Sequence, residues 1–155
     1  MTDTIRIWVE TSHHAAFRVG GWAFVRKDAD GLSGAAGGER SVTAERAVLA
    51  GLAEALKGLP SGAAVAVLTG SSQIAALPAR IAAFTAGDEP PTENLDLWAQ
   101  LTTALKSVRV GRVENRPGTP PAFASAWAEL ARDKAKATGP FRSPIPKPNL
   151  AKAGA

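Results

Sequence analysis

Apolar and polar residues alternate near the start of the chain, which predicts a group of β-strands. Residues 4–12 place an apolar side chain at every second position up to Val9 and then reach Glu10. This is the period of a strand with one buried face. Residues 22–27 repeat the period after a glycine pair, and a Gly- and Ala-rich stretch at 32–40 follows a turn. We therefore expect three strands that form an antiparallel meander.

A helical period replaces the strand period at residue 44. Apolar side chains recur three or four positions apart as far as Leu59, and Pro60 then ends the pattern. Thr43 is suited to be the N-cap of this helix. Glu45 lies in the first turn, where a negative side chain also suits the helix dipole.

The second half of the chain alternates strands and helices. Residues 63–69 form an almost continuous apolar run, as expected for a central strand covered on both faces. We expect a helix over 71–84, broken or started late at Pro78, because proline removes a helix hydrogen bond.

After a proline-containing loop, Asn94 is suited to cap another helix that continues to Leu105. A fifth strand over 108–113 and a last helix over 122–137 complete the pattern. The order predicts an α/β domain over residues 1–137, with a mixed five-stranded sheet and helices on both faces. The segment 138–155 contains four prolines and little to bury, so we expect a disordered tail that is rich in Pro and Lys.

Composition narrows the classes of function. The 155 residues suit one domain, and the absence of cysteine excludes disulfides, zinc–thiolate sites and thiol nucleophiles. No apolar run approaches the roughly 18 residues that a membrane span needs, so we expect a cytoplasmic protein without a membrane partner. The net charge of +4 and the pI of 9.9 favour an anionic partner, although a basic C-terminal region also serves solubility alone.

Five short motifs follow one another along the chain. They are Glu10-Thr11-Ser12 with Gly20-Gly21-Trp22, Arg40 to Glu45, Thr69-Gly70-Ser71, Asn94 to Trp98, and Ala128 to Ala131. In this order they resemble motifs of the ribonuclease H type 1 family over roughly residues 4–137. The family's motifs are, in the same order, an Asp-Gly-Ser that leads to a Gly-Gly-aromatic, a Thr-Asn-Asn-x-x-Glu-like helix start, a Thr-Asp-Ser, an Asn-x-Asp-Leu-Trp and an Ala-Asp-x-Leu-Ala. The resemblance implies an RNase H-like fold.

The resemblance also implies a degraded active site. The family places four carboxylates around two divalent metals; here the corresponding positions are Glu10, Glu45, Gly70 and one on or near Ala128. Glu10 is longer than the family's Asp by one methylene, and two positions carry no carboxylate. The neighbouring Glu129 would point about 100° away on a helix. We expect Glu10 and Glu45 to bind a metal weakly or not at all. No cofactor is expected, with Mg²⁺ or Mn²⁺ serving any residual activity.

Substrate contacts that the resemblance implies fall on small polar residues and one arginine. These nucleic-acid-binding candidates are Ser12, Ser41, Thr43, Ser71 and Arg116. Arg116 corresponds to the family's histidine on a flexible loop. Trp22 and Trp98 are candidates for base stacking, but their places in patterned elements favour the core. The neighbouring His13 and His14 are candidates for a metal or phosphate, or are simply exposed.

Three hypotheses follow, and they leave open whether the protein is an enzyme. The first is a catalytically impaired or inactive RNase H-like module that binds an RNA/DNA hybrid or RNA. The second is a weak, metal-dependent ribonuclease H that cleaves the RNA strand of hybrids with Glu10 and Glu45. The third is a protein-interaction scaffold on the same fold, with a protein partner.

Overall fold

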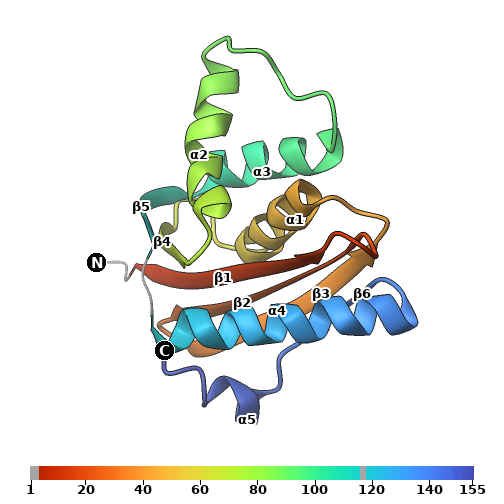
Figure 1. Ribbon diagram of the computed structural model, residues 1–155. Helices are drawn as coiled ribbons and strands as arrows, with labels where there is room; N and C mark the ends of the chain where they lie inside the picture. Colours follow the sequence, from red (N-terminus) through yellow and green to blue (C-terminus); the bar gives the residue numbers. More distant parts are fainter. Residues whose placement is uncertain (1–3, 116–117) are drawn as a thin grey trace.

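The computed structural model describes residues 4–115 and 118–155 as six strands and five helices (Figure 1). The strands are β1 (Ile5–His14), β2 (Val19–Asp28), β3 (Gly31–Arg40), β4 (Ala64–Thr69), β5 (Arg109–Asn115) and β6 (Phe141–Pro144). The helices are α1 (Ala44–Leu56), α2 (Ser72–Thr85), α3 (Leu95–Ser107), α4 (Thr119–Thr138) and α5 (Lys147–Leu150). Among these described residues, no helix is both long and apolar enough to cross a membrane.

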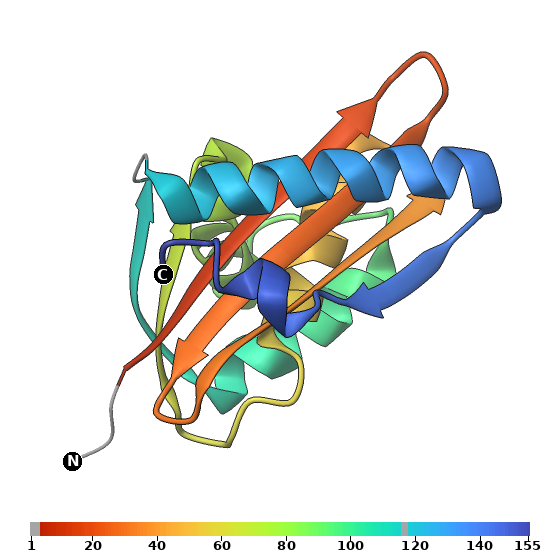
Figure 2. The same ribbon diagram turned by 90° about the horizontal axis from the view of Figure 1, so that it is seen from below.

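All six strands belong to one mixed sheet with the order β5-β4-β1-β2-β3-β6. Strands β1, β2 and β3 form the expected antiparallel meander, β4 runs parallel to β1, and β5 runs parallel to β4. Helices α1, α2 and α3 lie on one face of the sheet, and α4 and α5 lie on the other (Figures 1 and 2). The α/β class and the meander are confirmed, but the sheet has six strands where the sequence predicted five.

The sixth strand comes from the segment that we expected to be disordered. Strand β6 pairs with β3, and the following residues bury Ile145, Leu150 and Ala153 beneath the sheet. There is space for them because the buried residues of α4 on this face are alanines. Gly34 of β3 adds to this space, since a Cβ at that position would lie only 3.1 Å from Leu150 Cδ2. Prolines are compatible with β6 because it is an edge strand. The segment after residue 140 therefore packs onto the sheet.

Two helices differ from their sequence predictions. Helix α2 continues through Pro78 without a break; proline removes one backbone hydrogen bond, and buried Ile74, Leu77 and Ile81 hold the helix on both sides of it. Asn94 precedes α3 with φ 56° and makes no side-chain cap. Its Oδ1 instead accepts a hydrogen bond from Arg46 Nη1 at 3.3 Å.

Other local predictions are confirmed. The Thr43 side chain accepts a hydrogen bond from the Arg46 N–H at 3.2 Å and caps α1. Trp22 and Trp98 are both buried in the core between the sheet and α1, α2 and α3. Trp8 is buried on the opposite face, with α4 and the C-terminal segment.

Helix α4 lies unusually close to β2. A Cβ added at Gly21 would lie 2.3 Å from the Ala128 carbonyl oxygen and 2.4 Å from the Arg132 nitrogen. The backbone of α4 therefore rests directly on the meander, and only small side chains fit at the contact.

Candidate functional site

The parallel pairing of β1 with β4 brings Glu10 next to Gly70. Trp8 of β1 lies opposite Leu68 of β4, so the residues two positions further along both strands meet at the same end of the sheet. The Glu10 side chain projects on the same face as Trp8, the face that α4 covers, because successive side chains of a strand alternate.

The Glu10 carboxylate is engaged by protein donors. Its Oε1 accepts hydrogen bonds from the Gly70 backbone N–H and from the Thr69 hydroxyl, the latter at 3.2 Å. Thr69 Oγ1 in turn accepts from the Ser71 N–H at 3.0 Å, and Ser71 Oγ caps α2 by accepting from the Ile74 N–H. Glu10 therefore holds the turn that leads from β4 into α2.

Burial has the largest effect on the pKa of Glu10. The residue is only 7% exposed, and desolvation raises the pKa of its carboxyl above the usual value, with the hydrogen bonds from Gly70 and Thr69 opposing the rise. A raised pKa favours the protonated form, whereas a metal ligand must be deprotonated.

Glu45 has a different partner. It projects from the first turn of α1, and its Oε1 lies 2.9 Å from Arg80 Nη2 of α2. The Arg80 guanidinium also stacks 4.7 Å above the Trp98 ring. Glu45 and Arg80 line a pocket of about 280 Å³ between α1 and α2, together with Val48, Ser72, Gln73 and Ala76. The sequence did not predict this ion pair, because Arg80 lies outside every motif.

The position of the expected fourth carboxylate lies in the core. Ala128 is fully buried in the layer between α4 and the sheet, whereas Glu129 is exposed. A carboxylate at 128 would have no room, because the same stretch of helix backbone contacts Gly21.

The polar candidates for substrate contact mostly have structural partners. Ser12 Oγ accepts a hydrogen bond from Arg132 Nη1 at 2.8 Å, and Thr43 and Ser71 cap α1 and α2. Ser41 is exposed, with φ 57°. Arg116 lies outside the described residues.

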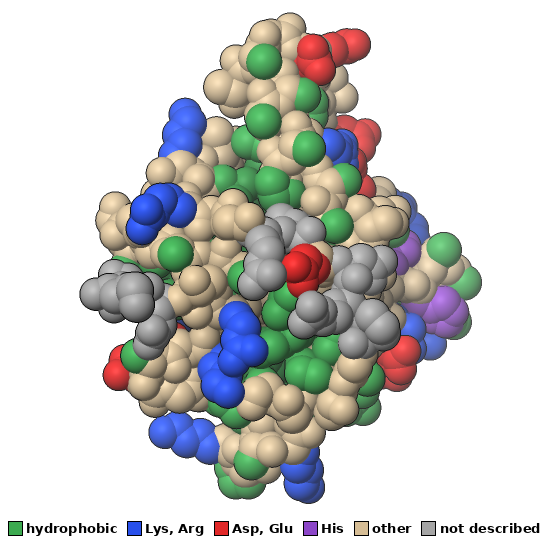
Figure 3. Space-filling model, turned by 90° about the vertical axis from the view of Figure 1, so that its left-hand side faces the viewer, with side chains coloured by type: hydrophobic (Ala, Val, Ile, Leu, Met, Phe, Trp, Pro, Cys, Tyr) green, Lys and Arg blue, Asp and Glu red, His purple; other side chains and the backbone are tan. Residues whose placement is uncertain are grey.

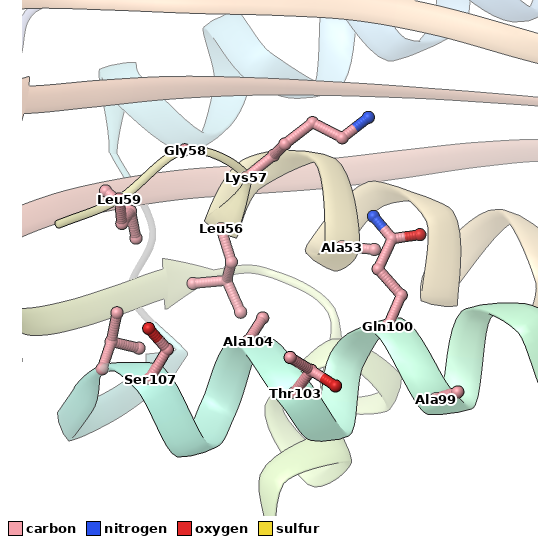
Figure 4. A pocket seen from close by; sticks show the side chains of 11 residues that line it. Ala53, Leu56, Lys57, Gly58, Leu59, Ala99, Gln100, Thr103, Ala104 and Ser107 are labelled. Atoms are coloured by element: carbon pink, nitrogen blue, oxygen red, sulfur yellow. The ribbon is translucent and has the colours of Figure 1, made fainter. Parts of the chain in front are cut away.

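A second groove lies away from these residues, between the end of α1 and α3 (Figure 4). It has a volume of about 460 Å³ and is lined largely by apolar and small side chains, among them Leu56, Leu59 and Ala104. Lys57 is its one charged lining residue. The groove offers no donor set for acid–base or metal chemistry.

Comparisons with known proteins give a match at the level of structure. No protein-family model matches the chain, and no curated protein is similar to it in sequence. The N-terminal RNase H domain of Rv2228c from Mycobacterium tuberculosis, solved as a fusion with maltose-binding protein, superposes with a TM-score of 0.59 at 20% identity, over 86% of this chain and 96% of that one.

Two further solved structures agree. LC9-RNase H1, a type 1 RNase H with the type 2 active-site motif, gives a TM-score of 0.65 at 17% identity, over 100% of this chain and 82% of that one. RNase H1 from the halophilic archaeon Halobacterium salinarum gives 0.57 at 15% identity, over 86% of this chain and 100% of that one. The chain has the ribonuclease H fold.

The RNase H-like fold implies a pair of divalent metals, and the side chains here fit them poorly. Within residues 4–115 and 118–155, no group of three or more His, Cys, Asp or Glu side chains is placed to hold a metal ion. Glu10 Oε1 accepts hydrogen bonds from Thr69 and Gly70, and Glu45 forms an ion pair with Arg80. Two carboxylates with separate partners do not supply the oxygen donors that hard divalent cations require.

Proposed function

We propose that this protein is an RNase H-like module that binds nucleic acid and has lost the cleavage chemistry of the fold. The observation that carries the proposal is the hydrogen bond from the Gly70 N–H to Glu10 Oε1. The resemblance places a metal-binding carboxylate at position 70. Here position 70 supplies a backbone donor to Glu10 in place of a second carboxylate.

Electrostatics supports the same conclusion. Two divalent ions bring four positive charges, and an exposed Mg²⁺ or Mn²⁺ pair is stabilised only by several converging carboxylates. Desolvation raises the Glu10 pKa, and Arg80 neutralises Glu45. Both carboxylates are therefore less available to a metal pair.

The charge distribution is compatible with a nucleic-acid partner. The net charge is +4, although the lobe formed by the end of α2 and its connection to α3 carries exposed acidic residues, Asp88, Glu89 and Glu93. Figure 3 shows acidic side chains at the top of this lobe, and both basic and further acidic side chains scattered over the rest of that face. A phosphate backbone would avoid the acidic lobe and contact the basic surfaces.

A cleavage assay tests the loss of chemistry. RNA/DNA hybrid is incubated with the wild type, Glu10→Ala and Glu45→Ala, in Mg²⁺ and separately in Mn²⁺. We expect no turnover above the protein-free control, and no difference among the three proteins. Turnover by the wild type that Glu45→Ala abolishes would overturn the proposal in favour of a weak nuclease that uses Glu10 and Glu45.

A binding assay tests the second half of the proposal. Hybrid, single-stranded RNA and single-stranded DNA are titrated at increasing salt, because phosphate contacts weaken steeply as salt rises. We expect measurable, salt-dependent binding to at least one polymer. Negligible binding to all three at low salt would favour a protein-interaction scaffold.

A further inference from the structure

The β1–β2 hairpin and the end of α4 carry a cluster of cations around an exposed aromatic ring. From it we infer a binding surface for a single-stranded segment of nucleic acid, on which Phe17 stacks with a base and Arg18 and Lys136 contact phosphates. We call His14, Phe17, Arg18 and Lys136 the hairpin surface. The inference rests on the proposed function and adds to it the site and the strandedness of the ligand.

Phe17 is the centre of the hairpin surface. It is 55% exposed, although burying a Phe side chain is normally favourable. The Lys136 Nζ lies 3.4 Å from the Phe17 ring centroid, and the His14 ring meets Phe17 edge-on at 4.8 Å. Exposed aromatic rings beside basic side chains are used by proteins to stack on unpaired bases.

The hairpin tip is held in a defined shape. The Phe17 N–H donates to the His14 carbonyl at 3.2 Å, and Arg18 takes φ 52°. Its carbonyl then accepts from the Val42 N–H at 2.9 Å, while His13 Nε2 lies 2.7 Å from the Val42 carbonyl. A tip fixed in this way presents its ring with little entropy lost on binding.

Positive charge exceeds negative charge around the ring. Arg18 and Lys136 are exposed. Arg40 is bound to the end of α4 through the Ala135 and Lys136 carbonyls, at 2.9 and 2.6 Å, which adds a further cation close by.

The acidic residues nearby are already paired. Asp133 is bound by Arg132 at 3.0 Å, and Glu39 of β3, which lies opposite Gly20, is bound by Arg46 at 3.3 Å. The excess of cations therefore faces solvent, where it attracts phosphate.

The shape of the tip selects an unpaired strand. Figure 2 shows the β1–β2 hairpin reaching beyond α4 at one end of the molecule, and Figure 3 shows the two histidines beside basic and apolar side chains at the edge. A flat ring stacks on a base only when the neighbouring base is displaced. A duplex offers such a face only at its end, whereas a single strand offers one at every nucleotide.

Fluorescence anisotropy with a labelled oligo-uridine tests the hairpin surface, with an RNA/DNA hybrid of equal length as the second probe. We expect Phe17→Ala to weaken binding of the single strand about 5- to 100-fold. Lys136→Gln should lower the slope of log affinity against log salt by about 0.7. The hybrid should be less affected by Phe17→Ala.

Two matched variants serve as controls. Leu95→Ala removes an apolar side chain of similar exposure, 58%, from α3, and Lys152→Gln removes an exposed lysine near the C-terminus. Thermal melting confirms that each variant is folded. We expect both controls to bind as the wild type does.

The outcomes separate the two proposals. If the wild type binds nucleic acid and Phe17→Ala and Lys136→Gln bind no more weakly than the controls, the hairpin surface is wrong and the proposed function stands. If the wild type binds neither probe at low salt, both fail. If Lys136→Gln binds the single strand more weakly and Phe17→Ala does not, Phe17 does not stack on a base, and the inferred preference for single strands is wrong.

Discussion

The carboxylates of Glu10 in β1 and Glu45 in α1 differ from the cations of the hairpin surface in what they contact. Glu10 and Glu45 contact donors of the protein itself, from Thr69, Gly70 and Arg80. The hairpin surface keeps Phe17 more than half exposed. The two carboxylates thus make contacts within the protein, whereas the turn that follows β1 keeps an aromatic ring exposed.

The difference follows from side-chain length and strand pairing. Glu10 is one methylene longer than Asp and reaches across to the adjacent strand, where the backbone of Gly70 supplies a donor. Phe17 lies in the turn between β1 and β2, where Lys136 and His14 contact its ring but leave it 55% exposed. Our proposals therefore assign nucleic-acid binding to a region separate from Glu10 and Glu45, and the following variants test that separation.

Glu10→Ala should have the largest effect on stability. It leaves the Gly70 N–H and the Thr69 hydroxyl without their acceptor, which costs about 1–3 kcal/mol of unfolding free energy, or a fall in Tm of roughly 3–10 °C. Calorimetry measures the change. If the variant is instead more stable than the wild type, Glu10 must repel other carboxylates, as expected at a metal site that lacks its metal. Oligonucleotide affinity should not change.

Arg80→Ala should have a smaller effect. The ion pair with Glu45 is 43% exposed on both sides, so solvent screens it, and its loss with the contact to Trp98 should cost about 1 kcal/mol. The variant leaves Glu45 without its cation. Titration with Mn²⁺, followed by calorimetry, should still show no specific binding. Tight binding by Arg80→Ala but not by the wild type would mean that Arg80 alone blocks a competent site.

Glu10→Gln should have the smallest effect, and one that depends on pH. Because burial raises the Glu10 pKa, the folded protein holds this proton more tightly than the unfolded chain. The carboxyl therefore contributes stability below its ordinary pKa of 4.5, and this contribution is lost as pH rises through the folded value.

The stability of the glutamine variant does not fall in this way as pH rises, because glutamine does not ionise. Its side-chain amide keeps an acceptor oxygen. Relative to the wild type, its unfolding free energy should rise by less than about 1 kcal/mol between pH 4 and pH 7. Urea unfolding at several pH values measures the difference. A difference that falls over this range would mean that the ionised carboxylate is the stabilised form.

Local patterns were enough to predict much of the fold. The period of residues 4–12, the Thr43 cap of α1 and the apolar run of β4 each depend on neighbours in sequence, and each prediction is confirmed. The order of these elements was also enough to predict an α/β sheet with a meander. The sequence placed Glu10 at the end of the first strand, whereas the structure continues β1 to His14.

Contacts between distant residues decided the rest. The C-terminal segment has too few apolar residues to predict order, yet the glycines of β3 and the alanines of α4 leave a space that Ile145 and Leu150 fill. Nothing in the sequence near Glu45 indicates that Arg80 neutralises it, and nothing near Phe17 indicates that Lys136 lies on its ring. Sequence periodicity reports which face of an element is buried, but only the folded chain decides which charges, donors and rings meet.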